Sequence, residues 1–165
     1  MLCALVRAQS GSMEHSRVSV PSEHTWQQVN ILLDRFPSNY YKSVDVDAGW
    51  HQIVINCNRE LAELDPYYVI LQIKQKFGGL RYYFEPSEAY DGVLFAKMNA
   101  IVLKYERAAA VTCEATGNPG VLMKSTSGRL KTLDPQWTTS TLFFRNYSIV
   151  EKTPIRALEQ EYNHE

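Results

Sequence analysis

The fold is decided by residues 67–84, which read YYVILQIKQKFGGLRYYF. Two runs rich in β-branched and aromatic residues flank Gly78-Gly79, and glycine readily supplies the positive φ values of a tight hairpin turn. We therefore predict a β-hairpin with arms at residues 67–76 and 80–84. The two-residue period of a strand predicts one apolar face, formed by Val69, Leu71, Ile73, Leu80, Tyr82 and Phe84.

Segments with helical periodicity lie on both sides of the predicted hairpin. Apolar residues recur at spacings of three and four over residues 24–36, 49–64 and 93–107. Residues 111–133 break into short strand-like pieces, and residues 137–150 have strand character because they are rich in Thr, Phe and Tyr. These patterns predict an α+β fold in which amphipathic helices pack on a small antiparallel sheet centred on the hairpin.

The length of 165 residues suits one domain with additions at its ends. We predict a flexible N-terminal arm at residues 1–23, an α+β domain at 24–136 and a C-terminal extension at 137–165. The extension holds a strand and a short helix at 155–162, which follows the helix-start pattern Thr153-Pro154.

Composition excludes several classes of protein. Lys and Arg number 17 against 18 Asp and Glu, a net charge of −1, which argues against a dedicated double-stranded DNA binder and against an acidic DNA mimic. No apolar run approaches the roughly 20 residues of a membrane helix. The scattered cysteines Cys3, Cys57 and Cys113 favour a reducing compartment such as the cytoplasm.

Gly49-Trp50 and the K-x-KFGGLR-aromatic-Tyr hairpin at residues 74–83 resemble a family of small phage and bacterial proteins. Members often end in a zinc-knuckle-like segment with a C-x-x-C pair and a later T-L-C-D-x-H. Here Cys113-Glu114-Ala115-Thr116 stands in place of the pair, and Thr132-Leu133-Asp134 stands in place of T-L-C. Since one cysteine cannot close a four-ligand zinc site, we expect a degenerate knuckle at residues 111–134 without metal or other cofactor.

The resemblance covers residues 49–134 and implies a phage or prophage origin and the cytoplasm of a bacterial host, but no reaction. The residues themselves contain no G-x-S-x-G, P-loop, G-x-G-x-x-G or H-E-x-x-H motif. Cys57 lies on the apolar stripe of a predicted helix, where a thiol acts as a small apolar residue. The nearby carboxylates fit a solvated surface better than a metal site: Asp45, Asp47, Glu60 and Glu63. We therefore predict that the chain is not an enzyme.

Ten tyrosines in a nearly neutral chain favour a protein-binding module, because Tyr, Trp and Arg dominate interface hot spots. We expect stoichiometric binding to, and inhibition of, a host or defence protein. The expected contact residues are the tyrosines Tyr40, Tyr41 and Tyr68 and a stripe on the terminal helix, Ile155, Leu158 and Tyr162. The C-terminal extension also allows a homodimer.

The alternative is a protein that binds RNA or another single-stranded nucleic acid. Alternation along the hairpin predicts one face with a tyrosine among cations, the arrangement of an RNA-binding sheet, formed by Lys74, Lys76, Arg81 and Tyr83. The string Lys76-Phe77-Gly78-Gly79-Leu80 resembles the RNP1 motif, but its glycines fall in a turn and not within a central strand. Basic strand residues also serve as edge protection.

Overall fold

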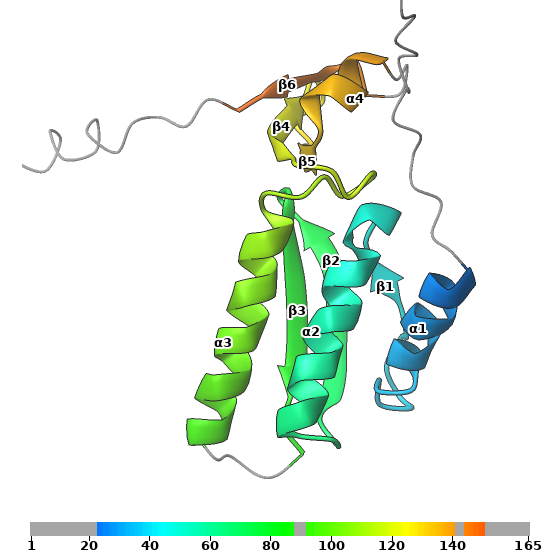
Figure 1. Cartoon of the computed structure of the whole chain (residues 1–165), viewed down its shortest axis with the longest axis vertical. Coiled ribbons are helices and arrows are strands. Elements are labelled where there is room, and N and C mark those ends of the chain that lie inside the picture. Colours follow the sequence, from blue (N-terminus) through cyan, green and yellow to red (C-terminus); the bar gives the residue numbers. More distant parts are fainter. Residues whose placement is uncertain (1–22, 88–91, 141–143, 151–165) are drawn as a thin grey trace, which may run out of the picture.

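The computed structural model describes residues 23–87, 92–140 and 144–150 (Figure 1). The predicted N-terminal arm up to residue 22 and the predicted helix at 155–162 lie outside these residues. The helices are α1 (Glu23–Leu33), α2 (His51–Leu64), α3 (Gly92–Ala109) and α4 (Pro135–Ser140), with a 3-10 turn at Ala48–Trp50 before α2. The strands are β1 (Val44–Asp45), β2 (Val69–Lys76), β3 (Gly79–Glu85), β4 (Val121–Ser125), β5 (Leu130–Leu133) and β6 (Tyr147–Ile149). The predicted α+β class is confirmed.

The predicted hairpin is β2–β3, and β1 adds to it in parallel to give the strand order β1-β2-β3. Its turn consists of Phe77 at φ 55° and Gly78 at φ 78°, one residue earlier than the expected Gly78-Gly79. Two successive positive φ values are what a two-residue type I′ hairpin requires. Gly79 begins β3 instead.

The inward face of β2 differs from the prediction. The β2–β3 register shifts between Ile70 and Gln72, and this irregularity adds one residue to β2. Ile70 and Ile73 are therefore both fully buried, whereas Val69 and Leu71, which strict alternation placed inside, are half-buried. On β3, Leu80 and Tyr82 are buried as predicted.

Helices α2 and α3 lie side by side on one face of this sheet, and α1 packs beside α2 (Figure 1). The core between helices and sheet includes Trp50, Val54, Cys57, Leu61, Ile70, Ile73, Leu80, Tyr82, Met98 and Val102. At the outer edge of β3, the Tyr82 N–H donates to Glu106 Oε1 of α3 at 3.4 Å. None of the helices in the described part of the chain combines the length and the apolarity needed to cross a bilayer.

A second, smaller sheet has the order β5-β4-β6 and its own cluster of buried side chains, Cys113, Ala115, Met123, Leu133 and Trp137. Residues 137–150 are not one strand as expected, because α4 occupies their start and β6 their end. The helix forms because Asp134 Oδ1 accepts the N–H groups of Gln136 and Trp137, with Pro135 in the first helical position. Trp137 and β6 belong to the C-terminal extension that the sequence analysis begins at residue 137. Both pack with β4, which belongs to the predicted α+β domain before that residue.

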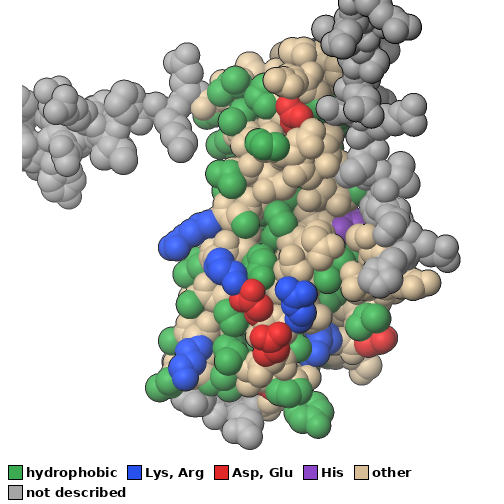
Figure 2. All heavy atoms as spheres, in the orientation of Figure 1, with side chains coloured by type: hydrophobic (Ala, Val, Ile, Leu, Met, Phe, Trp, Pro, Cys, Tyr) green, Lys and Arg blue, Asp and Glu red, His purple; other side chains and the backbone are tan. Residues whose placement is uncertain are grey.

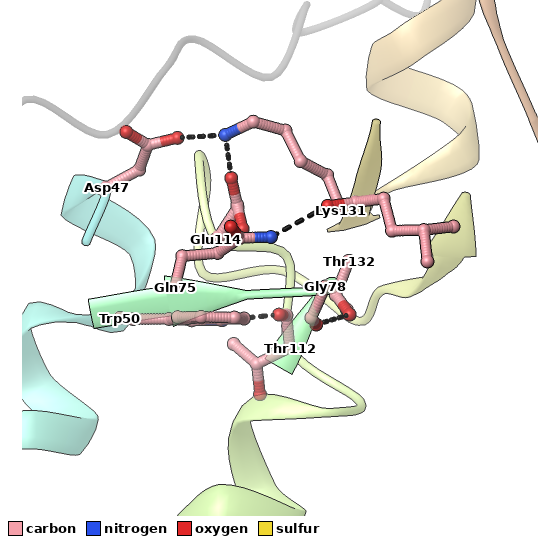
Figure 3. A network of polar contacts seen from close by, with 9 residues as sticks. Asp47, Trp50, Gln75, Gly78, Thr112, Glu114, Lys131 and Thr132 are labelled. Atoms are coloured by element: carbon pink, nitrogen blue, oxygen red, sulfur yellow. Dashed lines mark hydrogen bonds and ion pairs between the residues drawn. The ribbon is translucent and has the colours of Figure 1, made fainter. Parts of the chain in front are cut away.

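Direct hydrogen bonds join the two sheets at the hairpin tip (Figure 3). The Thr132 hydroxyl donates to the Gly78 carbonyl at 2.7 Å, and Gln75 Nε2 donates to the Leu130 carbonyl at 2.7 Å. Lys131 forms ion pairs with Asp47, at 3.0 Å, and with the buried Glu114. The tip of β2–β3 is therefore held against β5.

A second joint lies at the Gly49-Trp50 pair, ahead of α2. The Gly49 N–H donates to the Glu114 carbonyl at 2.8 Å. Trp50 Nε1 donates to the Thr112 carbonyl at 2.7 Å (Figure 3). Trp50 is fully buried, so its indole N–H needs this acceptor. The Gly-Trp motif therefore connects the start of α2 to the segment that enters the second sheet.

Candidate binding site on the open face of the sheet

The face of the β1-β2-β3 sheet that points away from α2 and α3 is called the open face below. On β2 and β3 it carries the basic and aromatic residues that the sequence predicts there. In the strand register Lys74 lies opposite Arg81, and Gln72 lies opposite Tyr83. Opposed residues of an antiparallel pair project to the same face of the sheet. Lys76 lies on the same face as Lys74, because every second residue of a strand projects to the same side. All five are half-buried or exposed, and Tyr83 keeps 44 % of its surface accessible. The predicted sharing of one face is confirmed.

A pocket of about 490 Å³ opens beside these residues. Tyr40 and Tyr41 come from the loop after α1, Asp45 comes from β1, and Tyr83 comes from β3. The pairing of β1 with β2, with Asp45 in register with Lys74, brings these distant segments together. The full lining is Phe36, Tyr40, Tyr41, Ser43, Asp45, Leu71, Gln72 and Tyr83.

Asp45 is the only charged residue among the described residues that line this pocket. Its side chain is exposed, and Oδ2 accepts a hydrogen bond from the Ser43 hydroxyl at 2.8 Å. Within residues 23–87, 92–140 and 144–150 it forms no ion pair. The pocket therefore combines aromatic walls with one carboxylate that forms no ion pair with any described cation.

The cations of the open face lie beside the pocket and do not line it. Lys74 Nζ is 6.0 Å from the centre of the Tyr83 ring, and Lys76 Nζ is 5.3 Å from that of Phe77. Arg81 Nη1 donates to the Leu80 carbonyl at 2.8 Å. In the described part of the chain none of the three cations forms a salt bridge.

Tyr68 does not belong to this surface, although the sequence suggested an exposed contact residue. It is only 1 % exposed, and its hydroxyl donates to Asn58 Oδ1 at 2.7 Å and shares a hydrogen bond of 2.8 Å with the Tyr82 hydroxyl. Burial raises the pKa of the Tyr68 hydroxyl. The irregularity in β2 accounts for this error, because it shifts the inward-facing positions at the start of the strand. Ile155, Leu158 and Tyr162 lie outside the described residues.

Two of the groups weighed for catalysis or metal binding, Cys57 and Glu60, occupy structural positions. Cys57 is fully buried in the main core, and this burial raises the pKa of its thiol, so it stays protonated at neutral pH. Glu60 forms an ion pair with Lys104 and accepts the Tyr105 hydroxyl, and the hydrogen bond from Lys104 is the main cause that lowers the pKa of Glu60. Neither group lines the pocket of the open face.

Hydrogen bonds within the chain hold the loop of the knuckle-like segment together. The Cys113 N–H donates to the Asn118 carbonyl at 2.7 Å, and the Gly117 N–H donates to the Cys113 carbonyl at 2.9 Å. Asn118 Nδ2 then reaches Asp134 Oδ2 at 3.0 Å, so that a side-chain pair links this loop to the end of β5. Over the described ranges, His, Cys, Asp and Glu side chains form no group of three or more that could hold a metal ion.

Sequence reasoning found the tyrosines of the pocket but missed the rest of its lining, including Phe36, Ser43, Leu71 and Gln72. A signal for β1 exists, since Ser43-Val44-Asp45-Val46 alternates polar and apolar residues, as a strand does. A strand of two residues, paired in parallel with β2, is too short for this alternation to be distinguished from a loop.

Comparison of the chain with protein-family models, with curated proteins and with solved structures gave no match in any of the three.

Proposed function

We propose that this chain is a non-catalytic protein-binding module that contacts its partner through the open face of the β1-β2-β3 sheet. The observation that supports it most directly is the convergence of Tyr40, Tyr41 and Tyr83 around one pocket. Tyrosine offers a large contact area at low cost in conformational entropy and is enriched in interface hot spots. Tyr41 is 88 % exposed at this site, which suits a residue that becomes buried on association.

The resemblance to small phage and bacterial proteins supports a phage or prophage origin as part of the same proposal. A small protein of this kind acts by stoichiometric contact and inhibits a host or defence protein by covering part of its surface. The free, buried thiols of Cys57 and Cys113 agree with the cytoplasm of a bacterial host.

Affinity purification from host cells with matched tyrosine variants tests this function. We expect the wild-type protein to recover a protein partner at defined stoichiometry, and Tyr41→Ala and Tyr83→Ala to recover roughly tenfold less, the loss expected for a hot-spot residue. Tyr67→Ala is the matched control, because Tyr67 is 82 % exposed but does not line the pocket. Equal recovery by all four proteins would show that the open face is not the contact surface.

Binding of single-stranded RNA is the second candidate, because Lys74, Lys76 and Arg81 share a face with Tyr83 and form no salt bridge among the described residues. Electrophoretic mobility shifts with a mixed-sequence RNA oligonucleotide test it. If this candidate is right, binding weakens steeply as salt rises and is lost when the three cations are replaced by Ala. Binding that does not respond to these replacements would exclude the hairpin face.

A further inference from the structure

We infer that the tyrosine-lined pocket receives the cationic side chain, lysine or arginine, of the protein partner. This inference rests on the proposed function and specifies the partner's chemistry. Its basis is the composition of the lining, which combines aromatic residues with Asp45, the only charged residue found there among the described residues. An ammonium or guanidinium group is attracted to both kinds of group.

The aromatic part of the site is arranged for contact with a cation. The face of a tyrosine ring is electronegative and attracts a cation within about 6 Å of its centre. Tyr83 is 44 % exposed, and Lys74 Nζ lies 6.0 Å from the centre of its ring, at the outer limit of this range. Tyr40, 46 % exposed, and Tyr41 supply further ring surface at the same pocket.

The electrostatic part of the site is the Asp45 carboxylate. One lone pair of Oδ2 accepts the Ser43 hydroxyl, and no other described residue donates to this carboxylate, which can accept further donors from a ligand. A lysine or arginine side chain supplies these donors together with the opposite charge. The volume of about 490 Å³ falls within the roughly 300–1,000 Å³ of ordinary ligand sites, so the pocket has room for one long side chain.

An acidic ligand fits the pocket less well. Lys74, Lys76 and Arg81 lie outside the lining, so a carboxylate or phosphate inside the pocket would meet Asp45 as the one charged group among the described lining residues. Lys74 has a different effect on a cationic ligand. It is in register with Asp45 across β1 and β2, and it therefore competes with the incoming cation for that carboxylate.

Asp45 and Lys74 are expected to have opposite effects on the affinity for a cationic peptide, and this difference provides a test. The probes are four blocked alanine-based pentapeptides with Lys, Arg, norleucine or Glu at the centre, titrated into 15N-labelled protein and followed by NMR. We expect the Lys and Arg peptides to shift the amide signals of residues 40–45, 72 and 83. We expect norleucine to bind about fivefold more weakly, the effect of losing one exposed charge contact.

Variants separate the contributions of the two charges. Asp45→Asn is expected to weaken binding of the Lys peptide about fivefold, and Lys74→Gln to strengthen it about twofold. Glu63→Gln removes an exposed carboxylate of α2 outside the pocket and is expected to change nothing.

Three outcomes with the wild-type protein would overturn the inference: no binding of the Lys or Arg peptide at millimolar concentration, equal binding of Lys and norleucine peptides, or preference for the Glu peptide. Weaker binding of the Lys peptide by Lys74→Gln would overturn it as well. The proposed function is tested separately by partner recovery. If Tyr41→Ala loses the partner while the Lys peptide fails to bind, only the cationic inference fails.

Discussion

At the scale of single residues, Gly49 shows how closely the two parts of the molecule approach each other. A Cβ at this position would lie 2.3 Å from the Cys113 carbonyl oxygen and 2.4 Å from the Gly117 nitrogen. Both are backbone atoms and cannot move aside as the end of a side chain can. Glycine is therefore required here by the approach of two backbones.

We predict that Gly49→Ala lowers the free energy of unfolding by about 2–4 kcal/mol. The added Cβ forces the two backbone segments apart and strains the hydrogen bond from the Gly49 N–H to the Glu114 carbonyl. Chemical denaturation followed by circular dichroism measures this. Gly92→Ala is the control, since no described residue outside its chain neighbours and the backbone of its own helix comes within 4 Å of a Cβ at that position. The prediction fails if both variants have the same stability.

Phe77 is the opposite case, a residue whose backbone conformation is unfavourable. It is 70 % exposed and lies at φ 55°, where asparagine and glycine are favoured over an aromatic residue. We predict that Phe77→Asn raises the free energy of unfolding by about 0.5–1 kcal/mol, because Asn-Gly is the preferred type I′ pair. A lower denaturation midpoint for the variant would contradict this.

At the scale of elements, Asp65 connects the end of α2 to both ends of the hairpin. Oδ1 accepts the Tyr67 N–H at 3.1 Å and the Ser87 hydroxyl at 2.7 Å, and Oδ2 accepts the Ser87 N–H at 2.7 Å. Burial alone would raise the pKa of Asp65, but these hydrogen bonds to its ionised form outweigh burial and lower it. The carboxylate therefore binds its proton less readily in the folded state than in the unfolded state.

A lowered folded pKa means that Asp65 stabilises the protein fully above its unfolded pKa of about 3.9, and that this contribution is lost as the pH falls through the folded value. We predict that Asp65→Asn lowers the stability at pH 7 by about 1–3 kcal/mol and that its difference from wild type shrinks below about pH 4. Denaturation curves at several pH values measure this. Asp34→Asn, at an exposed position, is the control, and a constant difference at all pH values would contradict the assignment.

Adjacent residues of β2 test which face of the sheet is buried. Ile73 is fully buried, whereas Gln72 points to the open face. We predict that Ile73→Asp leaves the chain unfolded, because a carboxylate would be buried without a partner, and that Gln72→Asp folds normally. Circular dichroism and one-dimensional NMR distinguish the two results. A well-folded Ile73→Asp protein would show that this face is not the core.

The elements also show what sequence patterns can and cannot predict. The β2–β3 hairpin and the helices α2 and α3 follow from strong local periodicity and a glycine turn. The irregularity at Leu71 was not predictable, because one added residue reverses the alternation and leaves no mark on composition. Asp134-Pro135 did carry a helix-start signal, and the Thr- and aromatic-rich residues after it obscured that signal.

At the scale of the whole molecule, hydrogen bonds from Thr132 to Gly78 and from Gln75 to Leu130 couple the two sheets. We predict that the slowest-exchanging amides of β2 and β4 have equal free energies of opening in native-state hydrogen exchange. The double variant Gln75→Ala/Thr132→Val is expected to lower the free energy of opening of β4 by about 1–2 kcal/mol. The free energy of opening of β2 is expected to stay above that of β4.

Gln52→Ala is the control, because it removes a hydrogen bond that lies within α2 and does not cross between the sheets. A wild-type protein in which β4 already opens well below β2 would show that the sheets unfold independently.

The whole molecule also explains why the pocket was only partly predictable. Residue type alone led to the prediction that Tyr40 and Tyr41 are contact residues, and this role stays a prediction. Their proximity to Tyr83 depends on β1, a strand of two residues whose pairing with β2 spans about thirty residues of sequence. Contacts between segments so far apart leave no local periodicity in the sequence. That Asp45 and Tyr83 line the same pocket could therefore not be predicted.

The hydrogen bond from the Tyr82 N–H to Glu106 has a consequence for self-association. An exposed strand edge offers free donors and acceptors to the strands of other molecules, and such edges nucleate fibrils. Here α3 engages a donor on the outer side of β3, and β1 offers only two residues at the opposite edge. Within the described residues, the sheet is therefore poorly suited to growth by strand addition at either end, and we expect this arrangement to disfavour polymerisation of the chain through its strand edges.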